Sequence, residues 1–185
     1  MIVLISGPSG SGKTTVARSL SAKLNLNYVS AGELFRQVAK SMGKDILDLN
    51  LEAEKDFSID KEIDRKIFER ALRGNVVIES HIVGWLLRDL SDVSVYLWAP
   101  VEERARRISI RDNLPYKEAL EKVIAREDSH GSRFWKYYGV DFSDLSAYDL
   151  TLNTFGLTAD KVVEIILQYI RSKNSFVDLP TAFKS

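Results

Sequence analysis

Residues 7–14 read Gly-Pro-Ser-Gly-Ser-Gly-Lys-Thr and match the pattern G-x-x-x-x-G-K-[ST] in full. This pattern is informative only in context, because a strand must lead into the loop and a helix must begin at its lysine. Here the apolar run Ile2–Ser6 precedes it, and Lys13–Leu24 follows with apolar residues at helical spacing. The three signals agree, so the segment predicts a loop that binds the phosphates of a nucleoside triphosphate. We call residues 7–14 the phosphate loop.

Each residue type in the phosphate loop has a physical role. Glycines let successive backbone N–H groups point into one concavity, and the helix N-terminus adds partial positive charge. We expect Lys13 on the β- and γ-phosphates, the Thr14 hydroxyl on Mg²⁺ and Thr15 near the α-phosphate. The predicted cofactors are therefore ATP and Mg²⁺. The predicted cofactor-binding residues are Gly7, Pro8, Ser9, Gly10, Ser11, Gly12, Lys13, Thr14 and Thr15.

The rest of the chain alternates between strand and helix patterns. Short apolar runs predict strands over 2–6, 27–30, 75–79, 93–99 and 148–153. Helical periodicity is found over 13–24, 32–41, most of 44–73, 84–90, 100–111, from 116 onward and over 158–171. In the 44–73 segment the apolar stripe comprises Ile59, Ile63, Ile67, Phe68 and Leu72. Apolar strands separated by helices predict an α/β fold, with a five-stranded parallel sheet of the P-loop NTPase type and helices on both faces.

Composition excludes several classes of protein. With 185 residues the chain predicts one domain. It has no Cys and only 2 His, which argues against a disulfide framework, a cysteine nucleophile or a His-rich metal site. The net charge of 0 argues against extended nucleic-acid binding. No apolar run is long enough to span a membrane, and the first residues resemble a strand rather than a signal peptide, so we expect a cytoplasmic protein.

Other nucleotide-binding classes fit the sequence less well. A GTPase needs a guanine-reading N-K-x-D, which is absent, and its D-x-x-G occurs only as Asp128-Ser129-His130-Gly131 in a polar segment. Motor proteins and AAA-type ATPases are usually much longer. A small kinase remains, and it must neutralise several phosphate charges, for which arginine is suited. Arginines follow the predicted strands in three groups: Arg36; Arg104, Arg107 and Arg111; Arg126 and Arg133.

These features together resemble the nucleoside monophosphate kinases, and most closely the compact archaeal type of cytidylate kinase. The resemblance covers about residues 1–170. The segments that carry it are 7–15, Ser30–Arg36, Asp60–Asp64, Val76–Glu79, Gly84-Trp85, Pro100 with Arg104, Arg107 and Arg111, Arg126 with Arg133, and Asp144–Asp149. The phosphate loop is generic, whereas Ser-Ala-Gly-Glu-x-x-Arg and Asp-Leu-Ser-x-Tyr-Asp are more specific.

The resemblance implies a division of the chain. It assigns residues 1–36, 74–111 and 145–171 to the core, with a C-terminal tail at 174–185. It implies a helical monophosphate-binding lobe at about 37–73 and a short lid at about 112–133. The implied reaction transfers a phosphoryl group from ATP to CMP or dCMP, and we expect a monomer.

The resemblance also implies roles for the arginines. Arg36 would hold the acceptor phosphate, together with Ser30 and Gly32 of the same segment. Arg107 would lie against the ATP base, and Arg111 would contact the ATP phosphates. Arg126 and Arg133 would reach into the closed site and stabilise the transferring group. With Lys13, these last four arginines form the predicted catalytic set.

Two departures from the family pattern bear on the acceptor. Where the family often has an arginine after the third strand, this chain has Ser80-His81. His81 is a substitute donor, especially if protonated, or else a strand-end histidine bonded to backbone. The phosphate loop ends Gly-Lys-Thr-Thr, where adenylate kinases typically have Gly-Lys-Gly-Thr, which favours another acceptor than AMP.

Three acidic residues complete the candidate site. Glu79 ends an apolar strand and is a candidate for holding Mg²⁺-bound water, the alternative being a capping carboxylate. Asp60 and Asp64 lie four residues apart, on one helix face, where they can accept hydrogen bonds from a base amino group. The alternative for this pair is a solvated face beside Lys61 and Arg65.

Three other functions stay open at this point. An adenylate-type kinase would share the fold and most roles. A shikimate-type kinase would need an acidic pair after the second strand, where this chain offers Ser30, Glu33 and Arg36. An ATP-binding switch or RNA-associated module would bind ATP without depending on an acceptor.

Overall fold

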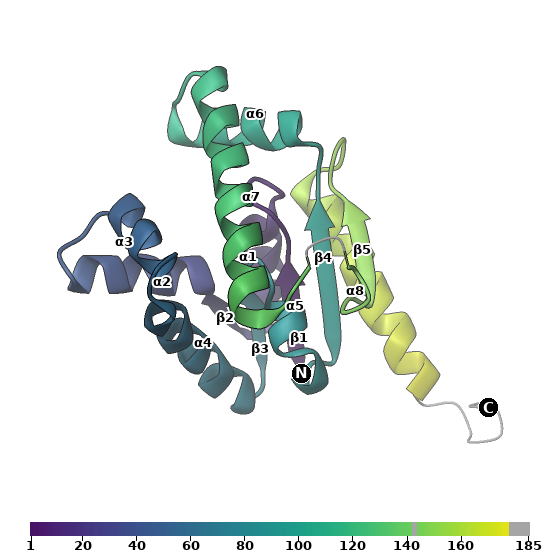
Figure 1. The fold of residues 1–185 in the computed structure, drawn as a ribbon. Coiled ribbons are helices and arrows are strands. Elements are labelled where there is room, and N and C mark those ends of the chain that lie inside the picture. Colours follow the sequence, from purple (N-terminus) through teal and green to yellow (C-terminus); the bar gives the residue numbers. More distant parts are fainter. Residues whose placement is uncertain (142–143, 178–185) are drawn as a thin grey trace.

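The computed structural model describes residues 1–141 and 144–177 and contains one five-stranded sheet (Figure 1). The strand order is β2-β3-β1-β4-β5, and every neighbouring pair is parallel. The strands are β1 (Ile2–Ser6), β2 (Asn27–Ser30), β3 (Val76–Glu79), β4 (Val93–Trp98) and β5 (Leu150–Asn153). The predicted parallel α/β sheet is confirmed, and β1, which carries the phosphate loop, is its central strand.

Helices cover both faces of the sheet because the side chains of a strand alternate between them. Val3 and Ile5 of β1 pack with α1 (Lys13–Leu24) and α8 (Ala159–Val177). Leu4 lies on the opposite face, with α4 (Phe57–Leu72) and α5 (Val83–Leu86). A short 3₁₀ turn, η1 (Arg88–Leu90), connects α5 to β4.

Helices α2 (Ala31–Ser41), α3 (Ile46–Ala53) and α4 project beyond the β2 edge of the sheet (Figure 1). Each of these helices begins after a residue type that favours the N-cap position. The side chains of Ser30, Asp45 and Asp56 each accept a backbone N–H of the first turn. Buried residues of these helices share one core with Leu4 and Ile78 of the sheet. The segment predicted as a lobe is thus continuous with the sheet core.

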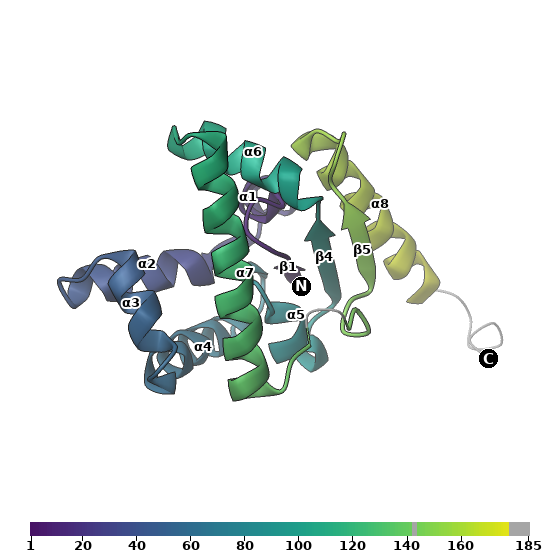
Figure 2. The ribbon, with the colours of Figure 1, turned by 45° about the horizontal axis from the view of Figure 1, so that its top comes forward.

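Helices α6 (Val101–Asp112) and α7 (Tyr116–Tyr138) form a hairpin beyond the C-terminal end of β4. The two helices pack through a small apolar cluster of Ala105, Ile108, Ala119 and Val123. From there α7 runs between the α2–α4 region and the sheet in both views (Figures 1 and 2). Residues 113–115 are the only non-helical part of the segment predicted as a lid.

Several local predictions differ from the structure, among them the helix predicted over 84–90, which is divided into α5 and the 3₁₀ turn η1. Strand β5 begins at Leu150 rather than Tyr148, because residues 145–148 form a turn in which the Tyr148 N–H donates to the Leu145 carbonyl oxygen. Phe68 and Leu72 are 45% and 62% exposed, so the buried stripe of α4 continues through Ala71 instead. Helix α8 extends to Val177 rather than ending at Arg171.

The structure also bears on the predicted C-terminal tail and on membrane-spanning helices. The predicted tail at 174–185 overlaps α8 up to Val177, and residues 178–185 lie outside the described residues. No helix in the described ranges is long and apolar enough to cross a membrane.

Candidate active site

Most of the candidate site lies at the carboxyl edge of the sheet, where ligands bind in open α/β folds. The phosphate loop follows β1, Ser30 ends β2 and Glu79 ends β3. Helix α6 follows β4, and Thr154 follows β5. Four other segments of the sequence therefore meet around the phosphate loop, as the strand order requires.

The phosphate loop adopts the positive φ angles that its glycines make possible. Gly7, Gly10 and Gly12 have φ angles of 146°, 80° and 91°, a region that side chains rarely adopt. A Cβ atom at Gly7 would lie 2.1 Å from the Leu97 carbonyl oxygen, and one at Gly10 would lie 2.7 Å from that of Arg104. The loop is thus pressed against β4 and α6. Ser11 inside it is fully buried.

Lys13 begins α1 and folds back over the phosphate loop. Its Nζ donates to the carbonyl oxygen of Pro8 at 3.2 Å. Burial lowers the pKa of Lys13 to about 8, and the positive charges of Arg126, Arg111 and Arg104 act in the same direction, while Glu79 opposes them. A bound anion would relieve this crowding of positive charge. Thr15, which the sequence predicts to lie near the α-phosphate, is exposed on α1.

Glu79 collects three hydroxyl groups at one carboxylate oxygen. Its Oε1 accepts from Ser30 Oγ at 2.6 Å, from Thr14 Oγ1 at 3.1 Å and from Tyr28 at 3.3 Å. The carboxylate is almost fully buried. Thr14 and Glu79, both predicted from sequence as metal-site residues, are in direct contact, and the Glu79 carboxylate does not cap α5, the helix that follows it. Oxygen donors of this kind suit a hard divalent cation that keeps several waters.

Three arginines from three helices, Arg36 of α2, Arg111 of α6 and Arg126 of α7, bring positive charge to this part of the site. Within the described residues, Arg36 of α2 and Arg126 of α7 form no hydrogen bond or ion pair. Loss of solvation lowers the pKa of Arg126, and the charges of Arg111 and Arg36 lower it further, which places the three within electrostatic reach. Arg111 instead pairs through two nitrogens with its neighbour Asp112, at 2.7 and 2.8 Å. Gly32 in the first turn of α2 lies beside Arg36.

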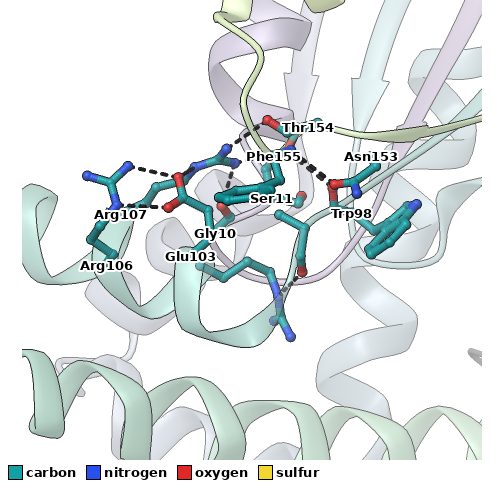
Figure 3. A network of polar contacts seen from close by, with 11 residues as sticks. Gly10, Ser11, Trp98, Glu103, Arg106, Arg107, Asn153, Thr154 and Phe155 are labelled. Atoms are coloured by element: carbon teal, nitrogen blue, oxygen red, sulfur yellow. Dashed lines mark hydrogen bonds and ion pairs between the residues drawn. The ribbon is translucent and has the colours of Figure 1, made fainter.

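Arg107 is held in a polar network at the edge of the phosphate loop (Figure 3). Its Nη1 donates to Thr154 Oγ1 at 2.9 Å and to the Gly10 carbonyl oxygen at 3.3 Å, and Nη2 donates to the Thr154 carbonyl oxygen at 2.9 Å. Glu103 accepts from Nε at 2.7 Å. The guanidinium is therefore a fixed plane between the loop and the β5–α8 connection.

Helix α4 contacts the C-terminal half of α7 through two acidic residues. Asp60 Oδ2 lies 3.1 Å from Arg133 Nε in a pair that is almost fully buried. Burial raises the pKa of Asp60 to about 6, against the effect of Arg133. Asp64 accepts from the Tyr138 hydroxyl, and burial raises its pKa as well. The interpretation of Asp60 and Asp64 as a solvated face is thus wrong.

His81 lies against the inner face of α7. Its ring centroid is 4.2 Å from that of His130 and 6.4 Å from that of Phe134. Burial, His130 and the cations Lys13, Arg126 and Arg133 hold the pKa of His81 well below its usual value. The lowered pKa disfavours the protonated form of His81 in this conformation, so a donor role at this position falls to the neutral imidazole.

Two residues that this geometry brings into the site carry little signal in the sequence. Thr154 anchors Arg107, and its only sequence signal is its place after the last strand. Glu127 binds the buried Arg104 at 2.8 Å, and no local pattern distinguishes it from other acidic residues of α7. Among the described residues, no group of three or more His, Asp or Glu side chains is placed to hold a metal ion.

Comparison with known proteins gives a consistent family. The sequence matches the family model for the cytidylate kinase-like family over residues 2–155. A cytidylate kinase from Sulfurisphaera tokodaii is 52% identical over 178 residues, covering 94% of this chain and 99% of that protein. One from Sulfolobus acidocaldarius is 52% identical over 175 residues, covering 94% and 96%. One from Saccharolobus islandicus is 49% identical over 173 residues, covering 93% and 92%.

Solved structures with this fold are more distant in sequence. Shikimate kinase from Acinetobacter baumannii in complex with shikimate has a TM-score of 0.64 at 22% identity, covering 92% of this chain and 93% of that one. An uncharacterized protein from Eubacterium ventriosum has a TM-score of 0.67 at 21% identity, covering 93% and 99%. At these identities the likeness is one of fold alone.

Proposed function

This chain belongs to the cytidylate kinase-like family, and from that premise we propose that it transfers the γ-phosphoryl group of ATP to CMP or dCMP. The observation that carries the proposal is an identity of about half, over nearly the whole chain, to relatives named cytidylate kinase. The site geometry agrees, because a phosphate loop faces arginines from three other helices. A shikimate-type reaction has only the fold in its favour, since Ser30, Glu33 and Arg36 stand where it would need an acidic pair.

The donor ATP binds on the phosphate loop. Lys13 and the loop N–H groups hold its phosphates, and the purine base lies against the fixed guanidinium of Arg107. The adjacent Thr14 and Glu79 oxygens fit a Mg²⁺ ion, whose chemistry is to draw charge from the β- and γ-phosphates. Arg111 leaves Asp112 for the donor phosphates once these offer it a stronger anion.

The acceptor lies between α2, α4 and α7. Arg36 binds its phosphate beside Ser30 and Gly32, at the start of α2. Asp60 and Asp64 accept hydrogen bonds from the amino group of the base, and Arg133, the partner of Asp60, donates to the base. The neutral His81 contributes a hydrogen bond without charge. We propose these roles for the acceptor-binding set.

The transfer itself needs positioning more than acid–base chemistry. A phosphate oxygen of CMP attacks the γ-phosphorus, the bond to the bridging oxygen breaks, and ADP leaves with that electron pair. The acceptor phosphate is already largely ionised near pH 7, so no strong general base is required. Lys13, Arg111 and Arg126 stabilise charge on the peripheral oxygens during the transfer, whereas Arg133, which is paired with Asp60, acts on the base instead.

The α2–α4 lobe at 37–73 and the lid at 112–133 exclude water, which would otherwise compete as acceptor. All the proposed groups come from one chain, so we propose a monomer that is complete as a catalyst. Because the proposed reaction consumes ATP, we also propose that the protein acts in the cytoplasm.

The direct test is ADP production from ATP and Mg²⁺ with single acceptors: CMP, dCMP, UMP, AMP, GMP and shikimate. We expect a rate that depends on CMP or dCMP and is far lower with AMP. A much higher rate with AMP than with CMP would identify the enzyme as an adenylate-type kinase instead. Absence of stimulation by every acceptor would refute phosphoryl transfer and favour an ATP-binding switch.

A further inference from the structure

One face of α7 lies against the phosphate loop. Val123, Glu127 and His130 are spaced so that they share a helix face. They border a cavity of about 40 Å³ together with Pro8, Ser9, His81 and Tyr96. The cavity between the inner face of α7 and the phosphate loop thus has room for only a few water molecules.

Arg104 connects this face of α7 to the phosphate loop. Its guanidinium is almost fully buried and has three partners on three segments. Nη2 donates to Glu127 Oε2 at 2.8 Å, Nη1 to the Ser9 carbonyl oxygen at 3.3 Å and Nε to the Ala99 carbonyl oxygen at 2.9 Å. The planar fork of arginine allows these contacts to hold simultaneously.

The position of Arg104 is itself fixed by the loop. Gly10 packs so closely on it that an added Cβ atom would lie 2.8 Å from the Arg104 Cβ. Arg104 therefore cannot shift without moving the loop. Glu127 supplies the carboxylate for this buried cation, although 42% of its own side chain is exposed. Removing that carboxylate would leave Arg104 buried with only carbonyl partners.

We propose that Glu127 is a positioning residue for phosphoryl transfer, which holds α7 through Arg104 at the height and rotation from which Arg126 faces the donor phosphates. Arg126 is the preceding residue on the same helix, and its charge already acts on Lys13 of the loop. Glu127 touches no reacting atom in this scheme. The inference rests on the proposed function, because it assigns Arg126 to the transferring group.

The first experiment compares Glu127→Ala and Glu127→Gln with the wild type. We expect kcat for CMP to fall by about tenfold to a hundredfold in Glu127→Ala, and less in Glu127→Gln, whose amide oxygen still accepts from Arg104. KM for ATP and for CMP should stay within about threefold. Glu121→Gln, which removes an exposed charge from α7, is the matched control and should leave kcat unchanged. A normal kcat in Glu127→Ala would overturn the inference.

A second experiment asks whether Glu127 acts through Arg126. If it does, Glu127→Gln should reduce kcat much less in an Arg126→Ala background than in the wild type. A residue that merely stabilises the fold would reduce kcat by the same factor in both backgrounds, and that result would overturn the inference. Thermal unfolding of each variant identifies losses caused by misfolding, and the isosteric Glu127→Gln keeps the test valid if Glu127→Ala unfolds. Failure of the proposed function is distinct, since the wild type itself would then show no CMP-dependent rate.

Discussion

The Asp60 carboxylate of α4 and the Arg133 guanidinium of α7 form a buried ion pair that leaves hydrogen-bonding capacity unused. Asp60 Oδ2 and Arg133 Nε are 3.1 Å apart, yet neither atom, nor Arg133 Nη1, has a hydrogen-bond partner with good geometry among the described residues. Buried polar groups without partners cost stability. A polar base placed between α4 and α7 would supply partners to both, so this pair is a strong candidate for contact with the acceptor.

The unusual state of Asp60 predicts a pH-dependent stability. Burial, with a contribution from Asp64, raises its pKa from 3.8 to about 6, so between about pH 4 and 6 the folded protein binds a proton more tightly than the unfolded chain. Stability from this group is therefore present at low pH and is lost as pH rises through 6. Asp60→Asn removes this loss. Its free energy of unfolding, relative to the wild type, should increase by on the order of 2 kcal/mol from pH 4 to pH 7.

Urea denaturation of both proteins at pH 4, 5, 6 and 7 measures this difference. Asp128→Asn, which removes an exposed carboxylate from α7, is the matched control. If the relative stability of Asp60→Asn decreased toward pH 7, Arg133 would dominate over burial, and the pKa of Asp60 would lie below its usual value.

The lowered pKa of Lys13 predicts an alkaline limit to ATP capture. Burial lowers that pKa to about 8 in the free enzyme, and an uncharged lysine attracts phosphates less. Because kcat/KM for ATP reports the free enzyme, it should decrease above pH 8, to about a tenth of its maximum at pH 9. The value of kcat/KM for CMP, measured at saturating ATP, should not decrease in this pH range, since the bound phosphates keep Lys13 protonated. An equal decrease of both parameters above pH 8 would assign the titration to another group.

The Lys13→Ala variant tests the role of Lys13 at a constant pH. It should lower kcat by roughly a thousandfold or more, because a charge aimed at the transferring phosphoryl group is lost. Steady-state kinetics with CMP measure the effect. Lys23→Ala, on the last turn of the same helix, is a suitable control and should retain the wild-type rate.

The contact between Glu79 and Thr14 predicts a defect in metal use. In Glu79→Gln the Mg²⁺ concentration for half-maximal rate should rise, and kcat should fall by about a hundredfold, because the site loses its carboxylate. Tyr28→Phe removes only the longest of the three hydroxyl contacts to Glu79 and should have little effect. A Mg²⁺ titration of initial rates separates the two variants. Equal titration curves for Glu79→Gln and the wild type would exclude Glu79 from the metal site.

The sheet and the phosphate loop were predictable because their signals are local. Each strand is a short apolar run, and the loop is eight consecutive residues whose glycines adopt the backbone angles that the motif requires. Strand order then brought Ser30 and Glu79 to the loop without further information. Local periodicity also explains the errors at Phe68 and Leu72, since it cannot show that α4 turns these side chains to solvent.

The partners of the charged side chains were not predictable, because they come from distant segments. Asp60 meets Arg133 and Arg107 meets Thr154 only through the packing of α7 on α4 and of β5 on β4. Next to Lys61 and Arg65 in sequence, Asp60 is indistinguishable from an exposed helix residue. Likewise the burial of His81 by His130 and Phe134, which keeps its imidazole neutral, depends on a helix about 50 residues away.

Arg111 gives the sharpest test of how the site rearranges. Its side chain is 61% exposed and is paired with Asp112, although we assign the guanidinium to the donor phosphates. Arg111→Ala should lower kcat by about a hundredfold or more, because a phosphate forms stronger charge-assisted bonds than an exposed carboxylate. Arg106→Ala is the matched control, since Arg106 lies on the same helix, is 58% exposed and pairs only with Glu103 in the described structure. Steady-state kinetics with CMP distinguish them, and a fully active Arg111→Ala enzyme would show that this arginine never leaves Asp112.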